Sequence, residues 1–246
     1  MFGRNLVARE SLPSTNSLLK EFADRGAVEG TVLISEEQTA GKGRMGRSWL
    51  SPKGTNLLFS ILLRPPMIVD DVFILTMALA LSAIDAVEDV SGLSASIKWP
   101  NDLYVANRKL AGILTEFSTE GRRLAYVVLG LGMNVNWSPG KREDTAYRAT
   151  SIFEETGRIV SRELLLVLVL KGFERAYGDV LSGKRDAFLE RWNSRCMVLG
   201  RRVEIDTPEG KVFGNAVRID SQGALIIKDH QGQEKKIRCG DVSVHF

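Results

Sequence analysis

The sequence predicts an α+β protein in two parts, a mixed-sheet domain over residues 1–195 followed by a small SH3-like β-barrel over residues 196–246. Strand-like and helix-like segments alternate through the first part, and two of the strands flank Glu120-Gly121-Arg122 in the pattern of an antiparallel hairpin. After Gly200 the texture changes, because short β-rich pieces alternate with glycine turns, as in small barrels.

Apolar runs bounded by turn residues predict the strands of the first part, over residues 6–9, 31–34, 56–63, 96–99, 103–105, 111–117 and 124–134. Ser14-Thr15-Asn16 has helix-capping chemistry and predicts a helix that ends at Gly26. Further helices are expected over residues 70–90, from 161 onward and over 184–193. The barrel strands are expected over residues 202–205, 211–219, 224–228 and 235–237.

Composition excludes several classes of protein. The 246 residues have a formal net charge of +3, too mild to indicate nucleic-acid binding by itself. With two cysteines and two histidines the chain has no zinc-ligand spacing, and although spacing alone leaves a disulfide open, nothing points to secretion. The start lacks a signal peptide, and the apolar stretch at 72–84 is too short to span a membrane. We therefore expect a soluble, cytoplasmic protein.

Residues 41–54 form a loop rich in glycines and cations, and its first half formally matches two phosphate-binding motifs. Gly41, Gly43 and Gly46 fit the dinucleotide pattern G-x-G-x-x-G, and Arg47 stands where a Walker A loop has its lysine. Both motifs require a helix directly downstream. Residues 47–54 contain Pro52 and Gly54 and cannot form a packed helix, so both interpretations are rejected.

What remains is the chemistry of the loop itself. Lys42, Arg44, Arg47 and Lys53 place four cations within twelve residues, separated by glycines that let backbone N–H groups approach an anion. A solvated basic surface loop is the alternative. Trp49 argues against it, because an indole on such a loop is costly to expose unless it closes over something flat. Cations that bind phosphate and an aromatic ring that stacks on a base together favour a nucleotide as the ligand.

Two further segments contain candidate site residues. In Lys98-Trp99-Pro100-Asn101-Asp102 the proline halts strand pairing, so the last two side chains emerge at a strand end, although such residues often only cap a turn. Lys109, at the entry of the next strand, either is solvated or adds a charge to the same anion site. Gly130 and Gly132 lie inside a strand, where glycine suits close approach of a ligand or another backbone.

In this order, these segments resemble the bacterial-type biotin–protein ligases. The resemblance covers nearly the whole chain and is borne by residues 14–16, 38–49, 98–104, 109–114 and 130–134. It implies a catalytic domain of the biotin/lipoate ligase type, which forms biotinyl-5′-AMP from biotin and ATP. Such an enzyme then transfers biotin to a lysine of a biotin carboxyl carrier protein. ATP with Mg²⁺ would be the co-substrate, and no protein metal site is expected.

The resemblance also implies roles for individual residues. Biotin would be bound by Ser14, Thr15, Asn16, Gln38, Lys42, Gly43, Arg44 and Lys109. ATP and the adenylate would be bound by Arg44, Arg47, Trp49, Asn101, Lys109 and Asn134. Lys109, Arg44 and Asp102 would be the catalytic residues, with Asp102 orienting the acceptor amine or serving only as a turn residue. Lys42 departs from the family's more frequent arginine, which predicts altered retention of the intermediate rather than loss of activity.

Three rival interpretations were weighed. A lipoate–protein ligase shares the fold, but the polar set around Ser14 and Gln38 suits a ureido ring better than an alkyl chain. A DNA-binding repressor is not expected, because only thirteen residues precede Ser14 and no recognition helix fits there. A non-catalytic nucleotide sensor would bind ATP without biotin-dependent turnover. Family members often self-associate through sheet edges, so a homodimer is an open expectation.

Overall fold

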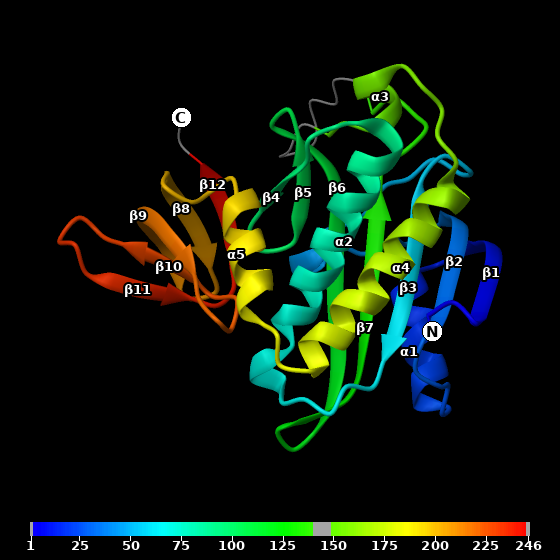
Figure 1. The fold of residues 1–246 in the computed structure, drawn as a ribbon, viewed down its shortest axis with the longest axis horizontal. Coiled ribbons are helices and arrows are strands. Elements are labelled where there is room, and N and C mark those ends of the chain that lie inside the picture. Colours follow the sequence, from blue (N-terminus) through cyan, green and yellow to red (C-terminus); the bar gives the residue numbers. More distant parts are fainter. Residues whose placement is uncertain (1, 140–148, 245–246) are drawn as a thin grey trace.

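The computed structural model of the chain describes residues 2–139 and 149–244. The first part contains a mixed seven-stranded sheet in the order β1-β2-β3-β7-β6-β5-β4 (Figure 1). Its strands are β1 (Asn5–Leu12), β2 (Thr31–Gln38), β3 (Leu57–Leu63), β4 (Ser96–Lys98), β5 (Asp102–Val105), β6 (Arg108–Glu120) and β7 (Arg123–Met133). Only β1 and β2 pair in parallel in the described sheet, because helix α1 (Thr15–Asp24) crosses over between them.

Helix α1 packs on one face of the sheet, against β3 and β7. Its Leu19 and Ala23 join Leu33, Leu62 and Val128 in a small apolar cluster. Arg64, at the end of β3, closes the far end of the helix by donating hydrogen bonds to the carbonyl of Ala23 at 2.8 Å and to that of Ala27 at 3.2 Å. These bonds fix the C-terminal end of α1 on the sheet.

The opposite face is covered by α2 (Phe73–Ser91) and α4 (Arg162–Leu181), which lie across the sheet in Figure 1. Nearly every residue from Ile74 to Val87 is buried, since α2 packs against the sheet on one side and against α4 on another. Helices α3 (Ile152–Thr156) and α5 (Asp186–Arg195) complete this part. The main core therefore lies on this face and leaves the α1 face available for a binding site.

A second, antiparallel sheet follows, with the order β11-β10-β9-β8-β12. Its strands are β8 (Arg202–Thr207), β9 (Gly210–Ile219), β10 (Leu225–Lys228), β11 (Glu234–Ile237) and β12 (Asp241–Val244). It sits beside β4, at the edge of the large sheet opposite β1 (Figure 1). Contacts that join the parts include the indole of Trp99, which donates to the Gly223 carbonyl at 2.9 Å, and the Met197 amide, which donates to the Ile97 carbonyl at 2.8 Å.

The predicted fold class, a mixed-sheet α+β domain followed by a small SH3-like β unit, is confirmed. The predicted boundary between residues 195 and 196 falls at the end of α5. Several local expectations differ, and β1 and β2 are longer than expected. The helix expected from Asp70 begins at Phe73 after a 3₁₀ turn at Val69–Asp71, the strand expected from Ala111 begins at Arg108, and α3 and β12 were not expected.

Both cysteines are free thiols, Cys196 buried and Cys239 exposed. No helix among the described residues is long and apolar enough to cross a membrane.

Candidate active site

A pocket of about 820 Å³ opens at the N-terminal end of α1, over strands β6 and β7. Its walls come from α1, the glycine–cation loop (residues 41–54), the turn before β5, the start of β6, the segment after β7, and β12 of the second sheet. All residues that the resemblance implied for ligand binding or catalysis line it: Ser14, Thr15, Asn16, Gln38, Lys42, Gly43, Arg44, Arg47, Trp49, Asn101, Asp102, Lys109 and Asn134. Residues separated by up to 227 positions in the sequence, from Ser14 to Asp241, thus meet in one cavity.

One end of the pocket is a cluster of hydroxyls and amides held in place by mutual hydrogen bonds. The backbone N–H and the hydroxyl of Thr15 both donate to Oε1 of Gln38, at 2.7 and 3.0 Å. Asn16 donates through Nδ2 to the Leu114 carbonyl at 3.1 Å. Ser14, the N-cap of α1, is 2% exposed. This hydroxyl–amide cluster (Ser14, Thr15, Asn16 and Gln38) is therefore rigid before any ligand arrives.

Two supporting residues of this cluster were not predicted. Ser60 on β3, fully buried, places its hydroxyl 2.7 Å from Oγ1 of Thr15 and 2.6 Å from Oδ1 of Asn16. Glu116 on β6 accepts from Nδ2 of Asn16 at 3.0 Å and from Nζ of Lys20 at 2.8 Å. Burial acts to raise the pKa of Glu116, but the hydrogen bonds from Lys20 and Asn16 outweigh it, so its pKa lies below the ordinary value.

Replacing Glu116 by glutamine should remove a pH-dependent part of the protein's stability. Because the folded-state pKa of Glu116 is lowered, its contribution is complete above the unfolded-state pKa of about 4.3 and is lost as pH falls through the lower folded value. We expect Glu116→Gln to reduce the free energy of unfolding by about 1 kcal/mol at pH 7, and by progressively less toward pH 3. Urea titrations at several pH values measure this, with Glu21→Gln on the exposed side of α1 as the charge-matched control. An equal loss at every pH would contradict it.

The floor of the pocket is made of glycines on adjacent strands. A Cβ at Gly130 would lie 2.0 Å from Oδ1 of Asn16, and a Cβ at Gly132 would lie 2.6 Å from Cε2 of Trp49. A Cβ at Gly112 would meet Oδ1 of Asp102 at 3.2 Å. The strand glycines are explained by close approach, here of side chains from α1, the glycine–cation loop and β5.

The glycine–cation loop folds back on itself as a narrow hairpin. The Gly43 amide donates to the Arg47 carbonyl at 2.7 Å, and the Trp49 amide donates to the Gly41 carbonyl at 2.9 Å. Met45 at its tip has a φ of 55°, a left-handed conformation that is uncommon for residues other than glycine. The loop thereby lays the Trp49 ring across the glycine floor, with Nζ of Lys109 5.6 Å from the ring centroid.

The loop cations separate into two groups. Nη1 of Arg44 donates to Oδ1 of Asn101 at 3.0 Å and contacts the Gly240 carbonyl at 3.5 Å, while Arg47 forms an ion pair with Asp241 of β12. Burial lowers the pKa of Arg44, and Asp102 and Asp241 partly offset it. Lys53, by contrast, pairs with Glu10 at 2.5 Å and does not line the pocket. The four loop cations expected from the sequence therefore do not form one anion site.

The turn at Trp99-Pro100, with a cis peptide bond, brings Asn101 and Asp102 to the pocket. Oδ2 of Asp102 lies 2.8 Å from Nζ of Lys109, and their side chains are 15% and 22% exposed. Lys109 lies within β6 and not on a solvated flank. The two residues place a positive and a negative charge at the middle of the pocket, between its two ends.

The far end of the pocket is formed by Asn134, Trp137, Pro139, Ala149 and Glu154. Asn134 is 4% exposed and donates through Nδ2 to the Thr150 carbonyl at 2.9 Å. The indole N–H groups of Trp49 and Trp137 are buried and have no hydrogen-bond partner among the described residues. A buried donor of this kind is costly unless a ligand pairs with it. Trp137 was not predicted to be a site residue.

Comparison with known proteins assigns this architecture. The family model for the biotin/lipoate A/B protein ligase family matches residues 8–134, and that for the biotin protein ligase C-terminal domain matches residues 198–244. The chain belongs to the biotin/lipoate A/B protein ligase family. The matched segment contains the hydroxyl–amide cluster, the glycine–cation loop, the Asp102–Lys109 pair and the glycine floor.

Similar ligases come from several bacteria. The chain is 32% identical over 245 residues to the bifunctional ligase/repressor BirA of Bacillus subtilis, covering 99% of this chain and 75% of that protein. It is 32% identical over 243 residues to the biotin–[acetyl-CoA-carboxylase] ligase of Mycobacterium tuberculosis, covering 95% and 86%. Among solved structures, the biotin protein ligase of Aquifex aeolicus in complex with biotin and ATP matches with a TM-score of 0.85 and 33% identity, covering 98% of this chain and 99% of that one.

The rejection of both phosphate-binding motifs is confirmed by the structure of the glycine–cation loop. The G-x-G-x-x-G string leads into a 3₁₀ turn at Arg44–Gly46 and a hairpin, and no α-helix starts there. The residues that sequence reasoning missed are those whose partners lie far away in the chain. Ser60 could have been found from the sequence, because it is a hydroxyl residue in an otherwise apolar strand. Nothing in the sequence around Asp241, in the second sheet, indicated a place in the pocket.

Proposed function

We propose that this protein is an ATP-dependent biotin–protein ligase that forms biotinyl-5′-AMP and transfers biotin to a lysine of a biotin carboxyl carrier protein. One observation favours this most: a single pocket combines a rigid hydroxyl–amide cluster, a glycine–cation loop and, between them, the Asp102–Lys109 pair. Relatives that share the fold are named as ligases for biotin, and one was solved with biotin and ATP.

The hydroxyl–amide cluster is the proposed site of the biotin ring. Ser14, Thr15, Asn16 and Gln38 offer donors and acceptors on short side chains, which suits a ureido group better than the alkyl chain of lipoate. Lys42 and Gly43, on the loop beside this end, would cover the ring. The carboxylate of biotin would then reach toward Lys109 in the middle of the pocket.

The adenylation step requires two anions to meet, and the cations of the pocket would make this possible. Lys109 would hold the biotin carboxylate and the α-phosphoryl oxygens, while Arg44 and Arg47 would neutralise charge as pyrophosphate leaves. Trp49 would pack on the adenine, with Asn101 and Asn134 at the nucleotide. The carboxylate itself is the nucleophile, so no protein nucleophile is required.

ATP would bring Mg²⁺ with it. Mg²⁺ commonly keeps several waters and is bound by substrate phosphates with one or two carboxylates, so the ion would be held mainly by the phosphates of ATP and by water. Carboxylates that line the pocket near the cations are Asp102 and Asp241. When bound, the ion would supply positive charge to the departing pyrophosphate.

Transfer to the carrier protein requires an uncharged lysine amine from the partner. Asp102 is the proposed residue that orients this amine. Its carboxylate would become available because Lys109, its ion-pair partner, would turn to the adenylate. The glycine–cation loop would exclude water from the mixed anhydride until the carrier docks.

Incubating the purified protein with α-labelled ATP, Mg²⁺ and either biotin or lipoate, without a carrier, tests the proposal. We expect labelled adenylate and pyrophosphate with biotin only. Adenylate with lipoate only would keep the mechanism and overturn the substrate. Adenylate with neither acid, from protein that binds ATP, would favour a nucleotide sensor and contradict the ligase assignment.

A further inference from the structure

Asn56 occupies a position where two walls of the pocket meet without itself lining the pocket. It is the last residue before β3, and Asn134 is the first after β7. Leu57 and Met133 are paired in the antiparallel ladder, so the glycine–cation loop and the segment 134–139 leave the sheet side by side. Both of these segments line the pocket.

The side chain of Asn56 joins these two segments. It is 1% exposed. Its Oδ1 accepts from the Val135 amide at 2.9 Å, and its Nδ2 donates to Oγ of Ser51 at 2.9 Å. Ser51 is in the returning half of the loop, and Val135 follows Asn134 directly.

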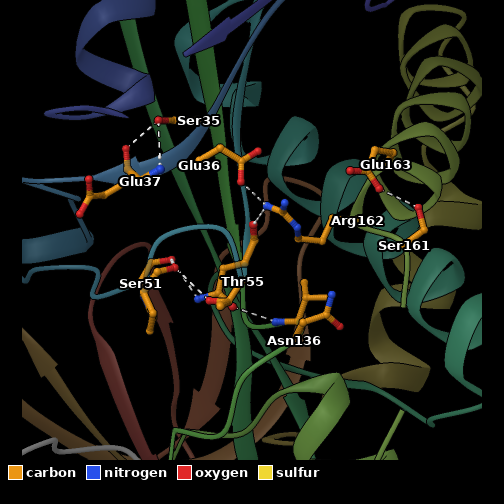
Figure 2. Close-up of polar contacts among 12 residues, drawn as sticks. Ser35, Glu36, Glu37, Ser51, Thr55, Asn136, Ser161, Arg162 and Glu163 are labelled. Atoms are coloured by element: carbon orange, nitrogen blue, oxygen red, sulfur yellow. Dashed lines mark hydrogen bonds and ion pairs between the residues drawn. The ribbon is translucent and has the colours of Figure 1, made fainter. Parts of the chain in front are cut away.

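The surrounding contacts hold the Asn56 backbone in place. Arg162 at the start of α4 reaches Oε2 of Glu36 on β2 at 2.8 Å and the Asn56 carbonyl at 3.1 Å. Figure 2 shows Arg162 directed toward Glu36, and the Asn136 amide donating to the Thr55 carbonyl, a bond of 2.9 Å. The backbone of Asn56 is thus fixed, and the hydrogen bond to Ser51 connects its side chain to the glycine–cation loop.

We propose that Asn56 is a positioning residue that couples closure of the glycine–cation loop to the placement of the segment 134–139, and so couples biotin binding to nucleotide binding. This rests on the proposed function. A carboxamide is planar, so the bond to Ser51 fixes the direction of Oδ1 toward Val135. When the loop opens and Ser51 withdraws, Nδ2 is left buried and unpaired, which is unfavourable. A ligand that closes the loop therefore also stabilises the site for the other ligand.

The coupling is measured as the ratio of the affinities for an ATP analogue without and with saturating biotin. The analogue has a methylene between the α- and β-phosphorus atoms, so no reaction occurs. Ser51→Ala removes the bond from Asn56 at a partly exposed residue that should not affect folding. Ser51→Thr keeps the hydroxyl. Thr55→Val is the matched control, because its lost hydroxyl bonds only to the Pro52 carbonyl within the loop.

We expect Ser51→Ala to lower the coupling ratio about fivefold, with little change in biotin affinity alone, while Ser51→Thr and Thr55→Val stay within about twofold of the unchanged protein. Asn56→Leu, if folded, should lower it at least as much. An unchanged ratio in Ser51→Ala, or an equal loss in Thr55→Val, would overturn the proposal. Independent binding of the two ligands by the unsubstituted protein would also overturn the proposal. Failure to bind biotin at all would instead overturn the proposed function, and this inference with it.

Discussion

Replacing Lys109 by alanine should lower the rate of adenylate formation by about 10²- to 10³-fold. The ammonium of Lys109 lies 2.8 Å from Asp102 and 5.6 Å from the Trp49 ring centroid, at the junction of the two ends of the pocket. Without it, two anionic substrates would meet beside an uncompensated carboxylate. Single-turnover formation of labelled adenylate at saturating biotin and ATP is the measurement, because it separates chemistry from product release.

Two variants make this result specific. Lys53→Ala removes a lysine of the glycine–cation loop that pairs with Glu10 outside the pocket, and should leave the rate unchanged. Lys109→Ala combined with Asp102→Asn removes both charges, and should recover stability without recovering activity. A Lys109→Ala protein that forms adenylate at the original rate would exclude Lys109 from the chemistry.

Replacing Gly130 by alanine should weaken biotin binding by about 100-fold. The new methyl group would lie 2.0 Å from Oδ1 of Asn16, so Asn16 must leave its hydrogen bonds to Leu114 and Glu116. Asn16 is held by hydrogen bonds to Leu114, Glu116 and Ser60, so moving it away from the new methyl group costs free energy. Isothermal titration calorimetry with biotin measures the loss.

Gly178→Ala on α4 is the matched control for this substitution. A Cβ at Gly178 meets nothing within 4 Å, and the residue lies within a helix on the opposite face of the sheet. It should leave biotin affinity unchanged and stabilise the protein by about 0.5–1 kcal/mol. If Gly130→Ala bound biotin as tightly as Gly178→Ala, the hydroxyl–amide cluster would not be the biotin site.

Much of the fold could be predicted because its signals are local. The cap at Ser14, the apolar run of β3 and the break at Pro100 each act within a few residues. A local signal that was overlooked is Ser151 with Glu154, a capping-box spacing, in which the Ser151 hydroxyl accepts from the Glu154 amide at 2.9 Å at the start of α3.

Many of the residues that line the pocket could be predicted from the sequence, but the hydrogen bonds and ion pairs between them could not. The motif residues came from short strings, which is why they could be recognised singly. Their contacts depend on which strands pair. Asn16 and Glu116 are 100 residues apart, and Arg47 and Asp241 are 194 apart. Lys53 shows the converse, since closeness in sequence to Arg47 did not bring it into the same site.

The floor of glycines has a consequence for how such a pocket changes. Gly112, Gly130 and Gly132 contribute only backbone, so these three positions give the cavity depth and add no side chain to its lining. Many of the lining side chains come from α1 and the glycine–cation loop, and α1 packs in an apolar cluster separate from the main core. New acid substrates should therefore be accessible by redesigning those two segments while the scaffold is kept intact, a division of labour that makes this fold a practical starting point for engineered acylation.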